Sequence, residues 1–309
     1  MALLFYSQFD DPAEWSGHLR RLMPDLEVRV WPDVGDPAKI EAALVWKAPP
    51  GELAKYPNLK LIVNLGAGVD AIVADRTIPA HIPITRIADP EMSRMMAQFV
   101  LLAVLRHHRN FVAFERAQRE RRWHYVHPKE TRETTVGIMG LGHLGAVAAA
   151  ELVRQGFTVR GWSRTPKSVE GVATFHGPDQ LADFLDGVGV LVVMLPYTKE
   201  TDGLVGKAVF DRLPQGACFV SVGRGRTVDE DALVAALRSG RIAEATLDVF
   251  REEPLRPDHA LYGFEQVLVT PHLASVAIPR SAAEQVVDNI RRAREGRPLQ
   301  NRIEPSRGY

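Results

Sequence analysis

The sequence predicts an α/β fold of two domains, each built on a parallel β-sheet. Its 309 residues suit two domains of roughly 100–200 residues each. Short apolar runs alternate with amphipathic segments in the first third of the chain and again from Thr134 onwards. Strands that alternate with helices favour a parallel sheet covered on both faces, so two such sheets are indicated. Hydrophobic residues make up 46% of the chain, enough for one or two sizeable cores.

The first alternation contains four apolar runs and two helical patterns. The predicted strands are Ala2–Tyr6, Glu27–Trp31, Ala43–Trp46 and Leu59–Leu65. The predicted helices are Pro12–Met23 and the shorter Gly51–Tyr56. The longest helical pattern, Met92–Gln118, follows Asp89-Pro90 and is expected to cross from one domain to the next. The polar, aperiodic stretch Arg119–Thr131 is typical of a linker or arm.

The second alternation predicts a complete dinucleotide-binding sheet, which has six strands with intervening helices. The predicted strands are Thr134–Met139, Phe157–Trp162, Gly189–Leu195, Ala217–Val222, Ala245–Val249 and Val267–Thr270. The predicted helices are Leu144–Gln155, Pro178–Leu185, Val228–Ser239 and Ile278–Glu295. Thr227 and Glu230 have the spacing of a capping box. The last helix can return to the first domain, so we expect a discontinuous domain, 1–95 with 285–309, and an inserted domain, 96–284.

Composition and charge exclude several classes of protein. Lys and Arg total 38 and Asp and Glu total 38, which argues against a general nucleic-acid-binding protein. The single cysteine, Cys218, excludes an intramolecular disulfide and a cysteine-rich zinc site. The first residues lack the pattern of a signal peptide, and no apolar run is long enough to span a bilayer. We therefore expect a cytoplasmic protein without membrane or nucleic-acid partners.

A glycine-rich turn indicates a dinucleotide site. Residues Gly140–Gly145 read G-L-G-H-L-G, between a predicted strand and an alanine-rich helix. Gly140 permits a tight turn, Gly142 lets the backbone approach a pyrophosphate, and Gly145 allows close helix–strand packing. The helix N-terminus adds N–H donors, so His143 and Leu144 also belong to the expected site. The alternative is a purely structural glycine turn.

The segment after the next strand predicts which dinucleotide binds. An NAD site usually has Asp or Glu there to bind the ribose 2′-OH, whereas this chain has no carboxylate at that place. Ser163 and Thr165 offer hydroxyls, and Arg164 and Lys167 offer cations for a 2′-phosphate. We therefore expect NADPH to be preferred and NADH to be used more weakly. The alternative is a solvated basic turn.

Three ionisable residues lie at or just beyond predicted strand ends, where open parallel sheets bind ligands: Arg224, Asp248 and His272. Glu253 follows five residues after Asp248. An arginine can hold the carboxylate and carbonyl oxygen of a 2-oxo acid while a hydride reaches the carbonyl carbon. A histidine then donates the proton, and a neighbouring carboxylate orients the imidazole. These residues predict the reduction of a 2-oxo acid.

Several motifs in order resemble the D-isomer-specific 2-hydroxyacid dehydrogenases. They are Val222–Glu230, Leu247–Phe250, Glu253–Leu255 and Thr270–His272. The resemblance implies a Rossmann dinucleotide-binding domain inserted in a flavodoxin-like substrate domain. It also implies that Arg224 anchors the substrate, that Glu253 supports the imidazole, and that His272 is the acid and base.

The same resemblance implies further contacts with cofactor and substrate. Asp248 corresponds to the residue that supports the nicotinamide carboxamide, and Leu65–Asp70 to the loop whose backbone N–H groups hold the substrate carboxylate. The residues expected to contact the substrate in the first domain are Ala67, Gly68, Val69 and Trp46. For Trp46, the alternative is a role in packing only. The remaining residues expected at the cofactor are Leu195, Pro196, Thr201, Val222, Gly223, Asp248 and Ser275.

A finer resemblance is to the glyoxylate/hydroxypyruvate reductase A branch. It rests on Ala43–Trp46, Trp162–Thr165 and Arg307–Tyr309. It implies a homodimer that reduces glyoxylate to glycolate and hydroxypyruvate to D-glycerate with NADPH. Ser221 departs from the Asn of most of the wider family, and Gln98 from the Glu of many members. The alternatives are a dehydrogenase of another D-2-hydroxy acid, and a nucleotide-sensing corepressor that binds peptides.

Other polar residues are given simpler roles. Cys218 is expected to fill a buried strand position. His107 and His108 are adjacent, so they do not share a helix face, and we expect a solvated or interface role and no metal site. Arg106–Arg122 contains six arginines. It is a solvated helix and arm, or it attracts anionic substrate, or it places Trp123 near a neighbouring subunit.

Overall fold

The computed structural model describes residues 1–304 and divides into two compact units. The first unit contains Met1–Met92 and the chain from Val276 onwards, and the second contains Ser93–Ser275. The boundary that we expected between residues 284 and 285 falls inside α9 (Pro279–Glu295), all of which belongs to the first unit. Arg307–Tyr309, part of the finer resemblance, lies outside the described residues.

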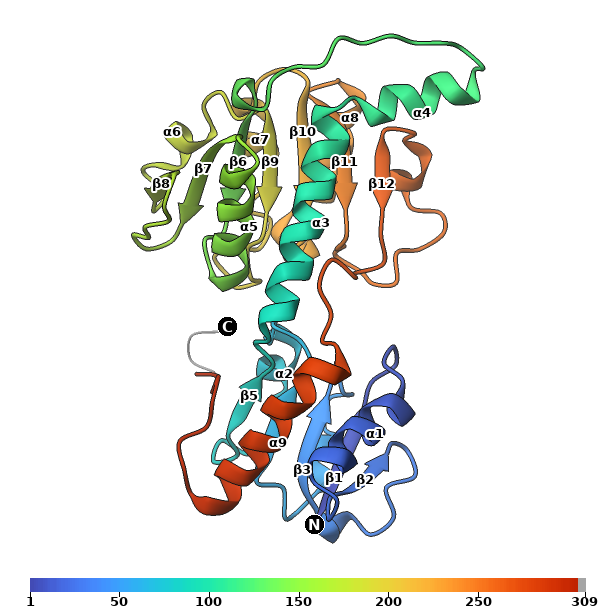
Figure 1. The fold of residues 1–309 in the computed structure, drawn as a ribbon, viewed down its shortest axis with the longest axis vertical. Helices are drawn as coiled ribbons and strands as arrows, with labels where there is room; N and C mark the ends of the chain where they lie inside the picture. The colour runs from blue at the N-terminus through green and yellow to red at the C-terminus, as the bar shows by residue number, and fades with distance from the viewer. Residues whose placement is uncertain (305–309) are drawn as a thin grey trace. The chain divides into compact units, whose positions relative to one another are not determined.

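The first unit has a five-stranded parallel sheet in the order β2-β1-β3-β4-β5, which is the flavodoxin-like order (Figure 1). The strands are β1 (Ala2–Tyr6), β2 (Glu27–Val30), β3 (Ile40–Val45), β4 (Leu61–Asn64) and β5 (Ile84–Arg86). β1 is buried along its whole length because it lies between two neighbours and is covered by helices. The sequence pattern missed β5, since three residues at a sheet edge are too few to show a period.

Helices α1 (Pro12–Leu22) and α9 pack against each other and against this sheet. Trp15 and Leu19 of α1 share one core with Val286 and Ile290 of α9, so the last helix does return to the first unit. The Asp11 carboxylate caps α1 by accepting a hydrogen bond from the Ala13 N–H at 2.8 Å. The expected helix Gly51–Tyr56 is a single 3-10 turn, Leu53–Lys55, and the short α2 (Asp70–Ala74) was not predicted.

The second unit has a seven-stranded parallel sheet in the order β12-β11-β10-β9-β6-β7-β8. Its strands are β6 (Thr135–Met139), β7 (Thr158–Ser163), β8 (Val172–His176), β9 (Val190–Val193), β10 (Ala217–Ser221), β11 (Ile242–Leu247) and β12 (Val267–Val269). With β6 as its first strand, this is the Rossmann order with one further strand at the edge. The predicted α/β fold with two parallel sheets is therefore confirmed.

Helices cover both faces of the second sheet (Figure 1). α3 (Pro90–His108) and α5 (His143–Arg154) pack on one face, where Val100 and Ala148 meet Ile138. α6 (Leu181–Leu185), α7 (Lys207–Arg212) and α8 (Glu230–Arg238) pack on the other, where Phe210 meets Phe219 at 5.3 Å between ring centroids. Within residues 1–304, no helix combines the length and apolar character that membrane crossing requires.

Three local expectations were wrong. The segment Met92–Gln118 is not one helix, because Asn110 takes a left-handed conformation (φ 60°) and separates α3 from α4 (Phe111–Arg119). The N-cap of α8 is Asp229, whose carboxylate accepts from the Ala232 N–H at 3.1 Å, so Thr227 does not start a capping box. The second sheet also has β8, an edge strand that is too exposed to show an apolar run.

Candidate active site

The glycine turn joins β6 to α5 and is shaped by close backbone contacts. Gly140 has φ 113°, and a Cβ at this position would lie 2.8 Å from the Met194 carbonyl oxygen. A Cβ on Gly145 would lie 1.9 Å from the Gly140 carbonyl oxygen. By contrast, no described atom lies within 4 Å of a Cβ built on Gly142, the N-cap of α5. Two of the three glycines are thus required by packing, and the middle one leaves exposed backbone at a helix N-terminus, which fits a pyrophosphate.

The basic turn lies directly beside the glycine turn. β7 pairs with β6, and the Gly140 N–H donates to the Trp162 carbonyl at 2.8 Å. The Ser163 hydroxyl is buried and donates to the Thr165 carbonyl at 2.8 Å, so its proton closes the turn. The side chains of Arg164, Thr165 and Lys167 are exposed. Two cations beside a dinucleotide fingerprint, without a carboxylate, fit the 2′-phosphate of NADPH.

The loop after β9 also lies at this edge of the sheet. A Cβ on Gly223 would lie 2.6 Å from the Leu195 carbonyl oxygen, so the chain after β9 and the chain after β10 are in backbone contact. The Thr201 hydroxyl donates to the Pro196 carbonyl at 2.8 Å and accepts from the Thr198 N–H at 2.8 Å, which closes the loop. Val222 is buried and Ser275 is half-buried.

His272 and Glu253 form a hydrogen-bonded pair. The distance from His272 Nδ1 to Glu253 Oε2 is 2.8 Å, and the two side chains are 24% and 20% exposed. The other carboxylate oxygen of Glu253 accepts from the Phe250 N–H at 3.1 Å, which fixes its orientation. Because an ionised carboxylate only accepts hydrogen bonds, Nδ1 carries a proton in this pair. A half-buried imidazole oriented through one nitrogen suits proton transfer at the other.

Asp248 holds the loop that carries His272. Its carboxylate, only 1% exposed, accepts from the Thr270 hydroxyl at 2.6 Å, the Leu273 N–H at 2.9 Å and the Ala274 N–H at 2.9 Å. Its carbonyl accepts from the His272 N–H at 2.9 Å. His272 itself has φ 55°, a left-handed conformation that is uncommon outside glycine and needs such support. The resemblance suggested that Asp248 supports the nicotinamide carboxamide and the active-site charge balance, and sequence reasoning missed this positioning role.

Arg224 lies on a neighbouring loop that packs against the one bearing Glu253. Its guanidinium donates to the Gly223 carbonyl at 2.8 Å, and its own carbonyl accepts from the Thr227 hydroxyl at 2.6 Å. A Cβ on Gly225 would lie 1.9 Å from the Phe250 carbonyl carbon. The structure thus brings together in one unit the loops that carry Arg224, Glu253 and His272.

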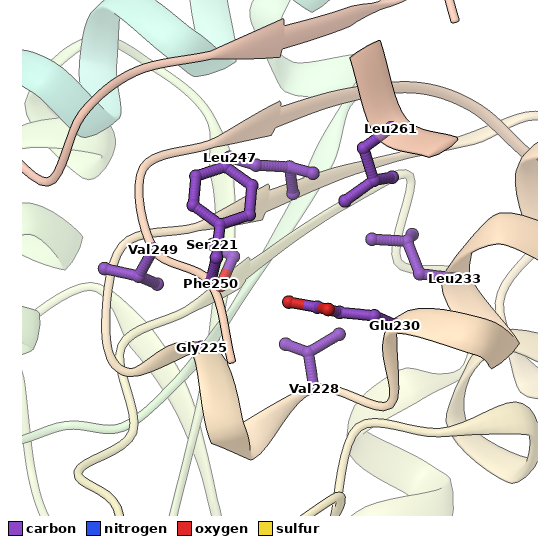
Figure 2. A pocket seen from close by; sticks show the side chains of 9 residues that line it. All are labelled: Ser221, Gly225, Val228, Glu230, Leu233, Leu247, Val249, Phe250 and Leu261. Atoms are coloured by element: carbon purple, nitrogen blue, oxygen red, sulfur yellow. The ribbon is translucent and has the colours of Figure 1, made fainter. Parts of the chain in front are cut away.

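A small cavity of about 10 Å³, about the size of one water molecule, lies beneath these loops (Figure 2). It is lined by Ser221, Gly225, Val228, Glu230, Leu233, Leu247, Val249, Phe250 and Leu261. The buried Ser221 hydroxyl has no hydrogen-bond partner among the described residues. The Glu230 carboxylate, which lines the cavity, accepts from the Arg251 N–H at 2.7 Å. The mainly aliphatic lining is that of a packing gap, and Ser221 is one of the two polar side chains that line it.

The expected substrate loop lies in the first unit, between β4 and α2. The side-chain amide of Asn64 donates to the carbonyls of Gly66 at 2.8 Å and Gly68 at 2.9 Å, which fixes the loop. Sequence reasoning missed Asn64, although a polar residue ending an apolar strand was a usable signal. A Cβ on Gly66 would lie 2.3 Å from the Trp46 ring, so Trp46 packs against this loop. Ala67 and Gly68 are half-buried, and Val69 is buried.

The solvated role that we expected for His107 and His108 needs correction, and the structure also defines the surroundings of Cys218. His107 and His108 are not solvated, being 6% and 7% exposed, because both face into the second unit. His108 Nδ1 lies 2.9 Å from the Thr134 hydroxyl, and burial lowers the pKa of this histidine. Cys218 is half-buried, and burial, together with the charge of Glu244, raises the pKa of its thiol to about 12. Such a thiol stays protonated at neutral pH and is a poor nucleophile.

Four of the six arginines in the 106–122 run form ion pairs with glutamates. Arg106 pairs with Glu115 at 2.7 Å, and Arg122 with Glu120 at 2.8 Å. Arg116 and Arg119 both lie within 3.5 Å of Glu265, so these two guanidinium groups share one carboxylate. Trp123, in the irregular segment after α4, is 96% exposed.

Comparison with known proteins gives consistent matches. Residues 101–274 match the model of the D-isomer specific 2-hydroxyacid dehydrogenase, NAD binding domain. The glyoxylate/hydroxypyruvate reductase A of Yersinia enterocolitica is 38% identical over 314 aligned residues, covering 100% of both chains. A D-isomer specific 2-hydroxyacid dehydrogenase from Xanthobacter autotrophicus Py2, solved with NADPH and MES, is 56% identical with a TM-score of 0.94 over 100% of this chain and 99% of that one.

A further solved relative is the NADPH-dependent glyoxylate/hydroxypyruvate reductase of Sinorhizobium meliloti, in complex with NADP and sulfate. It is 32% identical to this chain, with a TM-score of 0.93 over 100% of this chain and 99% of that one. The matches to these relatives extend over both units, and the match to the family model includes the glycine turn and the loops of Arg224, Glu253 and His272. The chain therefore belongs to the D-isomer-specific 2-hydroxyacid dehydrogenases, a family of NAD(P)-dependent oxidoreductases.

Proposed function

We propose that this protein reduces small 2-oxo acids with NADPH, converting glyoxylate to glycolate and hydroxypyruvate to D-glycerate. The observation that carries the proposal is the His272–Glu253 pair. The loop of Glu253 is in contact with that of Arg224, and all three residues lie in the same unit as the glycine turn. The names of the relatives from Yersinia and Sinorhizobium support this choice of substrates.

In this proposal each side chain has one chemical task. The Arg224 guanidinium binds the carboxylate and the carbonyl oxygen of the 2-oxo acid and so polarises the carbonyl. His272 donates a proton from Nε2 to the developing alkoxide, while Glu253 holds Nδ1–H and stabilises the imidazolium form. The bound NADPH supplies the hydride. In the reverse direction, neutral His272 takes the hydroxyl proton.

The two units divide the remaining tasks. We assign the second unit to the cofactor, through the glycine turn, the 163–167 turn and the loops after β9 and β10. We assign the first unit to the substrate carboxylate, through the backbone N–H groups of Ala67, Gly68 and Val69 and a neighbouring contact from Trp46. Asn64 is the residue that would keep those N–H groups in place.

We further propose a cytoplasmic homodimer. A single thiol without a disulfide partner suits a reducing compartment. The exposed aromatic rings of Trp123, Tyr125 and Phe111, which are 96%, 77% and 52% exposed, are apolar surface that a second copy would cover. Sedimentation velocity, with Trp123→Ser as the variant, tests this assembly. A wild-type monomer at micromolar concentration would refute it.

The decisive experiment for the activity is a steady-state panel of 2-oxo acids with NADPH and with NADH. We expect the highest kcat/KM for glyoxylate or hydroxypyruvate with NADPH. A higher value for a branched or aromatic 2-oxo acid would favour another D-2-hydroxy acid dehydrogenase, and equal values for the two cofactors would refute the NADPH preference. Absence of turnover together with stoichiometric capture of a peptide partner would indicate a corepressor.

A further inference from the structure

A second group of chemically reactive side chains lies at the amino ends of β10 and β11. Cys218 is the second residue of β10, and Glu244, the third residue of β11, is its direct partner in the parallel register. Neighbouring strands are about 4.8 Å apart, so these two side chains lie side by side on one face of the sheet. The cluster is separate from the proposed active site, whose loops follow the opposite, carboxyl ends of the same strands.

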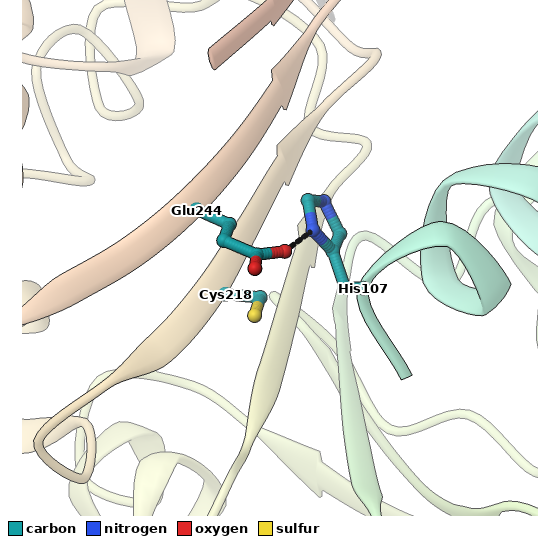
Figure 3. A group of neighbouring side chains, drawn as sticks. All are labelled: His107, Cys218 and Glu244. Carbon is teal, nitrogen blue, oxygen red and sulfur yellow. Dashed lines mark hydrogen bonds and ion pairs between the residues drawn. The ribbon is translucent and has the colours of Figure 1, made fainter. Parts of the chain in front are cut away.

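His107 reaches this face from the last turn of α3 (Figure 3). Its Nδ1 lies 2.7 Å from Glu244 Oε2, and its side chain has no exposed surface. One nitrogen of His107, the Cys218 sulfur and one Glu244 oxygen all lie within 4.8 Å of one another. Metal ligands at about 2.0–2.3 Å from a tetrahedral zinc ion are roughly 3.3–3.7 Å apart, so small side-chain movements would bring the three atoms to these distances.

We propose that His107, Cys218 and Glu244 form a binding site for a zinc-like divalent cation. One nitrogen, one sulfur and one carboxylate oxygen are the donor set of such borderline-soft ions, and they do not suit Mg²⁺ or Ca²⁺. The partial exposure of Cys218 and Glu244 admits a water molecule as the fourth ligand. When the cation binds, the thiol proton and the His107 Nδ1 proton leave to solvent, and Nε2 takes up one proton from solvent, so that one proton is released in total. The Nδ1 lone pair then binds the metal in place of its hydrogen bond to Glu244.

The surroundings of His107 suit this role. Its second nitrogen, Nε2, lies 3.1 Å from the hydroxyl of Thr246, which is two residues beyond Glu244 on β11 and 1% exposed. A histidine bound to metal through one nitrogen commonly donates its other N–H to an oxygen, and a hydroxyl can accept that bond. Lys129 is close enough for its charge to act on the Cys218 thiol and opposes the cation, but the two anionic ligands outweigh this single charge.

Cobalt provides a direct test, because Co²⁺ bound by a thiolate shows a sulfur-to-metal charge-transfer band and Cys218 is the only cysteine. Purified full-length protein, stripped of metal, is titrated with Co²⁺ and then with Zn²⁺. We expect one ion per chain, a charge-transfer band that Zn²⁺ abolishes, and a higher Tm with Zn²⁺ than without. A wild-type protein that binds Co²⁺ without the band, or binds neither ion, overturns the proposal without any variant.

Variants then assign the ligands. Cys218→Ser and Glu244→Gln should each weaken Zn²⁺ binding, measured against a chromophoric chelator, by more than roughly 100-fold, and Thr246→Val by about 10–100-fold. Circular dichroism without metal verifies that each variant is folded. The control is His272→Gln, which removes a different histidine–glutamate pair and should bind Zn²⁺ as the wild type does. Unchanged affinity in Cys218→Ser, or loss of binding in His272→Gln, would place the ion elsewhere and overturn the assignment.

Discussion

Replacing Asp248 by Asn tests whether this carboxylate organises the loop of His272. The carboxylate accepts three hydrogen bonds with its two oxygens, from the Thr270 hydroxyl and from the N–H groups of Leu273 and Ala274. An amide has one oxygen and one NH2 group. If the amide oxygen accepts the hydrogen bonds from Thr270 and Leu273, the amide NH2 group faces the Ala274 N–H. Two hydrogen-bond donors then face each other in a buried position, and neither has an acceptor.

The structure sets the size of the expected effect. A buried donor without an acceptor costs about 1–3 kcal/mol, and the two remaining hydrogen bonds lose the strength that the charge gave them. We therefore expect Asp248→Asn to lower the free energy of unfolding by about 2–4 kcal/mol. Because His272 follows the displaced loop, and a 1 Å error in position can cost about 100-fold, kcat/KM for glyoxylate should fall by tenfold or more.

The assay combines denaturant unfolding with steady-state kinetics. The kinetics are measured at saturating NADPH, so that a change in cofactor affinity does not alter the measured kcat/KM for glyoxylate. Asp229→Asn is the matched control, because Asp229 is the N-cap of α8 and Asn caps helices as well as Asp. That variant should stay within about 0.5 kcal/mol of the wild type. If Asp248→Asn behaves like Asp229→Asn in both measurements, the positioning role is refuted.

Four further outcomes are expected. His272→Gln should lower kcat by about 100- to 10,000-fold while the Kd for NADPH in fluorescence titration hardly changes, and wild-type turnover would contradict its acid–base role. Arg224→Lys should raise KM and lower kcat together, with kcat/KM reduced by about tenfold or more, because an ammonium cannot reproduce the guanidinium fork; unchanged kinetics would exclude Arg224 as the anchor. Replacing Arg164 and Lys167 together by Ser should reduce kcat/KM with NADPH and leave kcat/KM with NADH nearly unchanged, and an equal loss with both cofactors would disprove contact with the 2′-phosphate. Burial lowers the pKa of His108 in the folded state, so the unfolded chain binds the extra proton first as the pH falls below about 6.5. The wild type should therefore lose more stability between pH 8 and pH 5.5 than His108→Gln does, as measured by urea unfolding, and equal losses would show that His108 does not contribute.

Long periodic segments and motif-bearing turns could be predicted from the sequence, whereas short edge elements could not. β1 and β9 are apolar runs because both faces of these strands are covered. β8 carries little apolar signal, since it lies at the sheet edge with mostly exposed side chains. The break at Asn110 was hidden because apolar residues on both sides continue the helical spacing, and a single left-handed residue redirects the chain without altering that pattern.

At the candidate site, the position of the glycine turn could be predicted from the sequence, whereas the contacts that hold the neighbouring loops could not. The glycine turn was predictable because Gly140 and Gly145 have steric reasons that show in the motif spacing. The roles of Asp248 and Asn64 depend on which backbone groups surround them, and those come from distant parts of the chain. His107 looked like a surface residue, since its partner Glu244 lies on another element far along the sequence.

The close backbone contact at Gly225 also limits which positions of this enzyme can be substituted to alter its substrate range. Because there is no room for a Cβ between the backbones of Gly225 and Phe250, the loop of Arg224 and the loop of Glu253 are in direct backbone contact within the second unit. Their relative geometry therefore does not depend on any motion between the two units. Changes of substrate range would then arise in the first unit, around the 65–70 loop and Trp46, while the proton-transfer machinery stays the same. Laboratory selection for new 2-oxo acids should accumulate substitutions there and leave position 225 as glycine.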